Sequence, residues 1–100
     1  MIIVTGAVRF GNGEIERLRS ALVNNIETSR KEAGCKAYSY AVDLLDPNLL
    51  RITEMWADEA AVDAHSKKLP ELMAPLEGAK IESMSVTAYE GEFLRNIVGE

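Results

Sequence analysis

Three side chains that could carry chemistry stand close together in the sequence: Glu54, Trp56 and the chain's single histidine, His65. Glu54 and Trp56 share one face of a predicted strand, because strand side chains alternate between faces. His65 lies near the end of a predicted helix that Asp58 caps. If this helix folds back over that strand face, an acid, an aromatic wall and an imidazole share one space. Such a set can take a proton from a small aromatic or enolic molecule near neutral pH.

Each of these side chains also has a purely structural interpretation. His65 can pack or form a local hydrogen bond at a helix end, and Trp56 can simply fill the core. Glu54 can form an ion pair with Arg9 or Arg51. A carboxylate between apolar neighbours needs some partner in either case, because an unpaired buried charge is costly. The spacing alone leaves both interpretations open.

Other residues could complete a binding site. Tyr38 and Tyr40 share a strand face and could donate to substrate oxygens, although aromatic rows are also common on half-buried strands. We expect one of the two to reach the site, and Ile52 to line it beside Glu54. Cys35 is expected to be a small buried residue. One His and one Cys far apart do not make a ligand set, so no metal is predicted.

The elements that would position these residues follow the order β-α-β-β-α-β. Predicted strands cover 2–10, 36–44, 49–56 and 79–90, a long helix capped by Asn12 covers 14–33, a short helix covers 58–67 and another starts at Pro70. Residues 46–48, Asp-Pro-Asn, read as the hairpin turn. This order is typical of an α+β, ferredoxin-like fold, with an antiparallel sheet and helices on one face. Residues 1–100 are expected to form a single domain.

The strands are apolar on both faces, yet the helices can cover only one of them. A large exposed apolar patch marks an interface, and a second copy related by a two-fold axis is the simplest cover. We therefore expect a homodimer. Residues 91–100 carry Phe93, Leu94, Ile97 and Val98, so this tail is expected to pack on the partner subunit.

Composition excludes several classes of function. The formal net charge of -5 argues against a nucleic-acid groove or an anionic membrane surface, which need concentrated Lys and Arg. No apolar run is long enough to span a membrane, and no signal-peptide pattern is present. A lone cysteine fits a reducing compartment, so we expect a cytoplasmic protein.

Three segments resemble the antibiotic biosynthesis monooxygenase domain family. Residues 34–38, Gly-Cys-Lys-Ala-Tyr, resemble the family's Gly-Cys-x-x-Tyr entry to the second strand. Residues 53–56, Thr-Glu-Met-Trp, resemble its Glu-x-Trp strand, and residues 58–65 resemble its capped helix ending in Ala-His. The similarity in element order covers nearly the whole chain.

The resemblance implies a dimeric α/β barrel, and in several members oxidation of quinols or phenolic polyketides by dioxygen without metal or flavin. Other members degrade haem, isomerise or bind small metabolites. This chain lacks the family's cavity Asn on its first strand and on the Trp56 strand face, and Lys67 and Lys68 stand where many members have a second His, so haem degradation is disfavoured.

The resulting hypothesis is a cofactor-independent monooxygenase that oxidises a small quinol, phenol or enolisable ketone. His65 would act as the base, and Trp56, Glu54, Tyr38, Tyr40 and Ile52 would bind the substrate. Two alternatives stay open: a non-oxygenase metabolite-binding protein or isomerase with the same pocket, and a purely structural dimer with a closed core.

Overall fold

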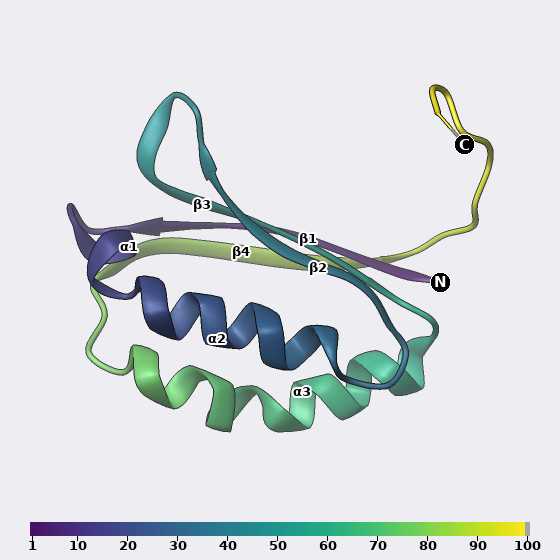
Figure 1. The fold of residues 1–100 in the computed structure, drawn as a ribbon, viewed down its shortest axis with the longest axis horizontal. Helices are drawn as coiled ribbons and strands as arrows, with labels where there is room; N and C mark the ends of the chain where they lie inside the picture. The colour runs from purple at the N-terminus through teal and green to yellow at the C-terminus, as the bar shows by residue number, and fades with distance from the viewer. Residues whose placement is uncertain (100) are drawn as a thin grey trace.

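A computed structural model describes residues 1–99 as an antiparallel sheet with helices on one face (Figure 1). The elements are β1 (Ile2–Phe10), α1 (Glu14–Arg17), α2 (Arg19–Arg30), β2 (Cys35–Asp43), β3 (Asp46–Trp56), α3 (Glu59–Met73), the 3-10 helix η1 (Ala74–Leu76) and β4 (Ile81–Glu90). The strand order across the four-stranded sheet is β2-β3-β1-β4. The predicted α+β, ferredoxin-like architecture is confirmed.

The alternation of side chains on the two central strands follows the sequence pattern. On β1 the side chains of Ile2, Val4, Val8 and Phe10 are buried against the helices. On β3 the side chains of Leu50, Glu54 and Trp56 are buried on the same side. A strand with one covered face has this period of two, so the predicted assignment of these faces is confirmed.

The register of the strands aligns the candidate site residues in rows. Val4 of β1 and Tyr38 of β2 both lie opposite Glu54 of β3. Tyr40 lies one step further along, opposite Ile52. The rows place the two tyrosines, the carboxylate and the indole on neighbouring positions of the helix-facing side, because directly opposite residues in an antiparallel pair share a face.

The long helix predicted over 14–33 begins at Glu14 as predicted, but the prediction is wrong in its continuity and in its C-terminal end. The chain forms α1 and α2 with a break at Leu18 (φ -97°, ψ 5°), and α2 ends at Arg30. The predicted cap Asn12 is also wrong, since the N-cap is Gly13 in the left-handed region (φ 79°). The Glu14 carboxylate accepts a hydrogen bond from the Lys80 backbone N–H at 2.9 Å, which ties α1 to the start of β4.

The second helical region also differs from the prediction. A single helix, α3, runs through Pro70 instead of ending before it. Proline removes one helical hydrogen bond, whose acceptor would be the carbonyl of Ser66. Ser66 and Pro70 are both exposed, so water can solvate that carbonyl. The buried side chains of His65 and Leu72 hold the helix on the sheet on either side of this point.

The β2–β3 hairpin turns earlier than predicted. The turn is Leu44–Leu45, and residues 46–48 already belong to β3. The Asp43 carboxylate accepts from the Leu45 N–H at 2.9 Å and from Arg51 Nε at 3.0 Å. This side chain therefore closes the tight turn, which leaves both leucines fully exposed.

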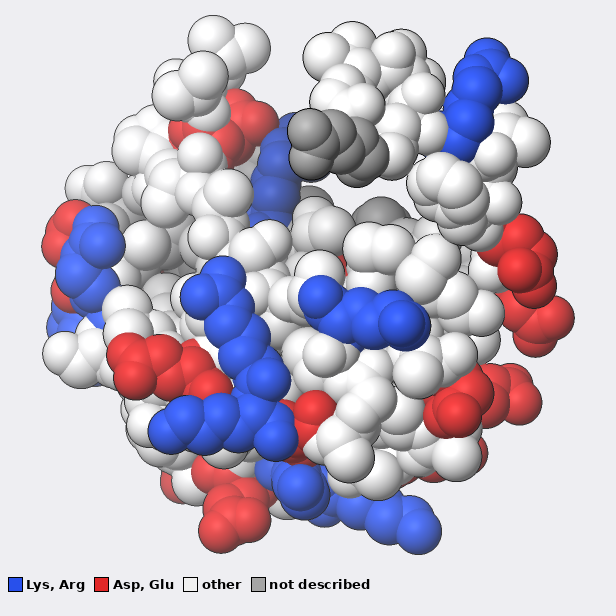
Figure 2. All heavy atoms as spheres, turned by 45° about the vertical axis from the view of Figure 1, so that its right-hand side comes forward, with Lys and Arg blue, Asp and Glu red and all other residues white. Residues whose placement is uncertain are grey.

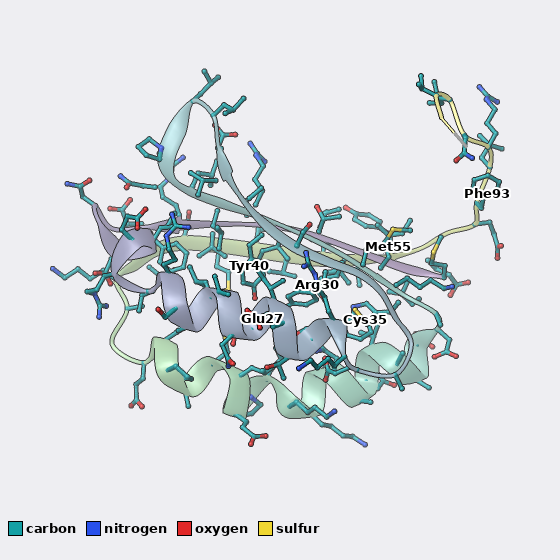
Figure 3. All side chains as sticks on the ribbon, in the orientation of Figure 1. Glu27, Arg30, Cys35, Tyr40, Met55 and Phe93 are labelled. Carbon is teal, nitrogen blue, oxygen red and sulfur yellow. The ribbon has the colours of Figure 1, made fainter. Side chains whose placement is uncertain are left out.

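The β4 strand and the tail after it are the least covered parts of the protein. Every residue of β4 is exposed, and the Gly91 N–H donates to the Met1 carbonyl at 2.9 Å before the chain leaves the sheet. The tail extends away from the body, with Phe93 70% exposed (Figure 3). Met55 lies on the sheet face away from the helices (Figure 3). Residue 100 of the predicted tail lies outside the described residues.

The rest of the surface carries both charge signs, interspersed over the face in Figure 2. None of the helices in residues 1–99 has the combined length and apolarity that a membrane span requires.

Gly34 provides a test of how the turn before β2 packs on α3. Its φ is 82°, and an added Cβ would lie 2.6 Å from the Ala61 Cβ. We expect Gly34→Ala to lower the free energy of unfolding by about 2 kcal/mol or more, from backbone strain plus the clash. Gly13→Ala is the control, since its φ is 79° but nothing lies within 4 Å of an added Cβ. Urea unfolding that shows equal losses in both variants would contradict the close contact between Gly34 and Ala61.

Candidate functional site

The indole of Trp56 is the centre of the candidate site. It is fully buried, and its Nε1–H donates to Glu54 Oε1 at 2.9 Å. The His65 ring stacks on it with ring centroids 4.6 Å apart and an interplanar angle of 34°. The Tyr38 ring makes edge contacts with both, with ring centroids 6.3 Å from Trp56 and 5.5 Å from His65. The strand face predicted from the sequence therefore does meet the histidine of α3.

The start of α3 places His65 in this set. Asp58 has extended backbone angles and its Oδ1 accepts from the Ala61 N–H at 2.9 Å, as an N-cap does. His65 follows two helical turns later, on the face directed to the sheet, and its side chain is buried. The predicted cap is confirmed, and the observed position of His65 follows from it.

Glu32 holds the other side of the histidine ring. Its Oε2 lies 2.6 Å from His65 Nδ1, and both side chains are buried. Lys68 Nζ lies 3.4 Å from the second oxygen of this carboxylate. Sequence reasoning missed Glu32 because it placed the residue inside a helix, whereas it lies in the turn between α2 and β2. Thirty-three positions separate Glu32 from His65, so no local spacing links the pair.

The carboxyl group of Glu54 is in a poorly solvated position. Burial raises the pKa of Glu54, while the hydrogen bond from Trp56 and the charge of His65 act in the opposite direction. His65 Nε2 lies 4.0 Å from Glu54 Oε1. The expected structural role of Glu54 as an ion-pair partner of Arg9 or Arg51 is wrong, because Arg9 pairs with Asp46 and Arg51 with Asp43. One imidazole thus lies between two buried carboxyl groups, Glu32 and Glu54.

Tyr38 and Tyr40 extend the site along β2. Their hydroxyls are 2.9 Å apart and hydrogen-bond to each other. Burial raises the pKa of both phenols, so both stay neutral and can donate to an oxygen. The expectation that only one would reach the site differs from the structure, which brings both close to it. Ile52 lies apart, packed against the apolar cluster that contains Leu50.

Two polar residues of α2, Asn25 and Ser29, were missed as site residues. Both are 0% exposed, and no hydrogen-bond partner for Asn25 Nδ2, Asn25 Oδ1 or Ser29 Oγ is present among residues 1–99. An unpaired buried polar group costs about 1–3 kcal/mol. The spacing did contain a signal: positions 18, 22, 25 and 29 form one helical stripe, and its last two members are polar.

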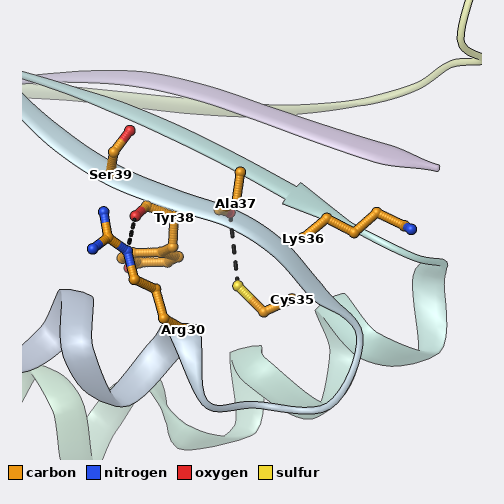
Figure 4. A pocket seen from close by; sticks show the side chains of 6 residues that line it. All are labelled: Arg30, Cys35, Lys36, Ala37, Tyr38 and Ser39. Carbon is orange, nitrogen blue, oxygen red and sulfur yellow. Dashed lines mark hydrogen bonds between the residues drawn. The ribbon is translucent and has the colours of Figure 1, made fainter. Parts of the chain in front are cut away.

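Two hollows border this set of side chains. One, of about 310 Å³, lies along the free edge of β2 and is lined by residues 35–39 and Arg30, which donates to the Tyr38 carbonyl at 2.9 Å (Figure 4). The other, of about 100 Å³, lies between α2 and β2 and reaches Tyr40. These hollows touch the set through the tyrosines, whereas His65, Trp56 and Glu54 pack directly on one another. No group of three or more His, Cys, Asp or Glu side chains within residues 1–99 is placed to hold a metal ion.

Comparison with known protein families identifies the family of this chain. Residues 1–69 match the family model for antibiotic biosynthesis monooxygenase. The chain belongs to the antibiotic biosynthesis monooxygenase family. The matched range contains Glu54, Trp56 and His65 together with Glu32, so the site lies within the part that defines the family. The resemblance inferred from the three sequence segments is confirmed.

Solved structures of this family are similar over nearly the whole chain. A Deinococcus radiodurans protein proposed to be an antibiotic biosynthesis monooxygenase is 29% identical, covers 99% of this chain and 100% of its own, and superposes with a TM-score of 0.88. A Nitrosomonas europaea protein with the same proposed name covers 93% and 100% with a TM-score of 0.82, but at 17% identity it shows the fold alone. An uncharacterized Synechocystis protein is 30% identical over an alignment of 95 positions, which covers 86% of this chain and 65% of that protein's length.

Glu54 should make stability depend on pH. Because burial raises its folded-state pKa above the ordinary value of 4.5, the folded protein holds this proton more tightly. The contribution of this bound proton to the free energy of unfolding is fully present below pH 4.5 and is lost as the pH rises through the raised pKa of Glu54. Glu54→Gln keeps an oxygen for Trp56 but cannot titrate. We expect its free energy of unfolding, measured by urea unfolding, to fall less between pH 4.5 and 7 than that of the wild type; equal changes would contradict the burial effect.

Proposed function

We propose that this protein is a cofactor-independent monooxygenase that oxidises a small quinol, phenol or enolisable ketone with dioxygen. The observation that carries the proposal is the buried histidine: His65 is stacked on Trp56 and fixed by Glu32 at 2.6 Å. These contacts hold the imidazole in one orientation, unlike the ring of a histidine that is free in solvent. Membership of the antibiotic biosynthesis monooxygenase family supports the reaction class.

Glu32 gives the imidazole a defined direction. As a carboxylate it accepts the Nδ1–H, so the neutral ring carries its lone pair on Nε2. Nε2 faces the side of the set that contains Glu54 and Trp56. His65 would take the hydroxyl or enol proton of the substrate at Nε2, and Glu32 would stabilise the imidazolium that forms.

The electrons for the reaction come from the substrate. Removal of a proton gives an electron-rich phenolate or enolate, which can pass electrons to dioxygen directly. For an activated CH₂ carbon, one oxygen atom becomes its carbonyl oxygen and the other leaves as water with the two hydrogens that the carbon loses. The four electrons lost by carbon equal those gained by dioxygen, so no external reductant is required.

The remaining residues would bind the ring and its oxygens. Trp56 offers an aromatic face and excludes water, while Tyr38 and Tyr40 offer neutral hydroxyls. Glu54 would accept from or donate to a substrate oxygen according to its protonation. Ile52, on the apolar side of Tyr40, would contact the body of the substrate.

A second candidate function is a metabolite-binding protein or isomerase without oxygen chemistry. The packing of the site favours it: both described hollows reach the tyrosines, whereas His65 and Trp56 are in direct contact. Ligand binding at the tyrosines alone would not need a base. Oxygen consumption discriminates between these two functions.

We also propose a homodimer. Tyr89 of β4 is 55% exposed and shares the uncovered sheet face with Met55, since both lie opposite Ile3, and the tail adds the exposed Phe93. A second copy placed on the uncovered sheet face would bury Met55 and give the tail a surface to pack on. The free thiol of Cys35 fits a reducing compartment, so we propose a cytoplasmic location.

Replacement of the base tests the proposed chemistry. His65→Ala and His65→Gln should lower oxygen consumption at least about 100-fold on any substrate found in a panel of quinols, phenols and enolisable ketones. Gln retains hydrogen bonding but cannot accept the proton. Ser66→Ala, on the exposed face of the same helix, is the matched control and should keep wild-type activity. If no panel member leads to oxygen uptake by the wild type, the monooxygenase proposal fails and the binding function remains.

A charge on the free sheet face tests the dimer. Sedimentation equilibrium at micromolar concentration should give twice the chain mass of 11.0 kDa for the wild type. Met55→Asp should shift the protein towards monomer, because it buries an unpaired charge in an apolar interface. Met73→Asp, at an exposed position on α3, should leave the dimer intact. A wild type that sediments as a monomer would rule out the barrel.

A further inference from the structure

Two polar side chains of α2 are buried without a well-formed hydrogen bond. Asn25 and Ser29 are 0% exposed, and three of their polar atoms make no hydrogen bond within residues 1–99. Buried polar atoms in folded proteins are almost always paired, so such a cluster requires an explanation. Leucine or alanine at these positions would continue the apolar stripe of Leu18 and Leu22 without this cost.

The unpaired atoms lie beside the two phenols of β2. Burial raises the pKa of the Tyr38 and Tyr40 phenols, while weak hydrogen bonding by Ser29 to Tyr38 and by Asn25 to Tyr40 acts in the opposite direction. Ser29 and Asn25 are therefore neighbours of the two hydroxyls, although neither reaches the geometry of a full hydrogen bond. The phenols are hydrogen-bonded to each other at 2.9 Å. Four side chains that can both donate and accept therefore converge between α2 and β2, and none of the four carries a charge at neutral pH.

A mostly apolar groove of about 100 Å³, with Arg19 among its lining residues, reaches this polar group at Tyr40. Leu22, which lines it, lies one turn before Asn25 on α2, and Ile26, which also lines it, directly follows Asn25 in the sequence. Tyr40 contributes to both the groove and the polar group. Apolar walls that end at a few convergent polar atoms are the usual form of a small-molecule site.

We propose that Asn25 and Ser29, together with Tyr38 and Tyr40, recognise a neutral hydroxyl or keto oxygen of the ligand while the α2–β2 groove holds its apolar body. This inference deepens the proposed function, and rests on it for the small aromatic or enolic class of ligand. Carboxylates and phosphates are disfavoured, because the four side chains provide no cation and burial of an unpaired charge is costly. Arg19 also lines the groove, but its guanidinium is paired with Glu16 at 2.7 Å.

Three probes of similar shape test the inference: phenol, toluene and benzoate. Titrations followed by NMR should show that the wild type binds phenol about fivefold or more tightly than toluene, and benzoate weakest. Asn25→Leu should lose the preference for phenol. It should also melt at or above the wild-type temperature, because it removes the unpaired amide. Asn24→Leu, one position away on the exposed face of α2, should keep both wild-type properties.

Several outcomes would overturn the inference. They are an unchanged preference for phenol in Asn25→Leu, or a wild type that binds toluene and benzoate as tightly as phenol. Ser29→Ala is a smaller change and provides the same comparison if Asn25→Leu does not fold. The titrations need no turnover, so a clear preference for phenol in a protein that consumes no oxygen would support this site while the monooxygenase proposal fails.

Discussion

The hydrogen bond between Glu32 and His65 is the interaction on which the rest of the site depends. It joins the turn after α2 to the middle of α3, and its 2.6 Å length requires these two segments to lie in contact. The same turn packs on α3 through Gly34 and Ala61, and Gly34 accepts from the Ala57 N–H at 2.8 Å. The orientation of the imidazole is therefore set by backbone packing as well as by the carboxylate, which is what a positioned base needs.

The core divides into an apolar part and a polar part. Val8, Phe10, Leu18, Leu22 and Leu50 form a cluster of ordinary aliphatic and aromatic packing near the hairpin end. At the other end Trp56 and Tyr38 pack among Glu54, His65 and Glu32, where burial opposes charge. The first cluster can provide stability, which permits the second to hold groups that weaken it.

Much of this arrangement was predictable from local patterns. The alternation on β3 placed Glu54 and Trp56 on one face, and the Asp58 cap set the phase of α3 that directs His65 to that face. The partner of His65 was not predictable, because a contact across thirty-three residues leaves no periodic trace. The burial of Asn25 could have been predicted from the sequence, since this polar residue continues a helical stripe of buried positions. The break of the first helix at Leu18 was not predicted, and the long-range contact beside it, from the Lys80 N–H to the Glu14 carboxylate, leaves no local pattern in the sequence.

Long-range proton–nitrogen NMR on the ¹⁵N-labelled protein identifies the tautomer of His65, and so tests most directly whether Glu32 accepts the Nδ1–H of this ring. The chain has a single histidine, so the assignment is unambiguous. We expect the neutral ring to carry its proton on Nδ1 and to leave Nε2 unprotonated, with a strongly downfield resonance for this proton that moves in Glu32→Gln. A neutral ring protonated on Nε2, or a spectrum unchanged in Glu32→Gln, would contradict this prediction.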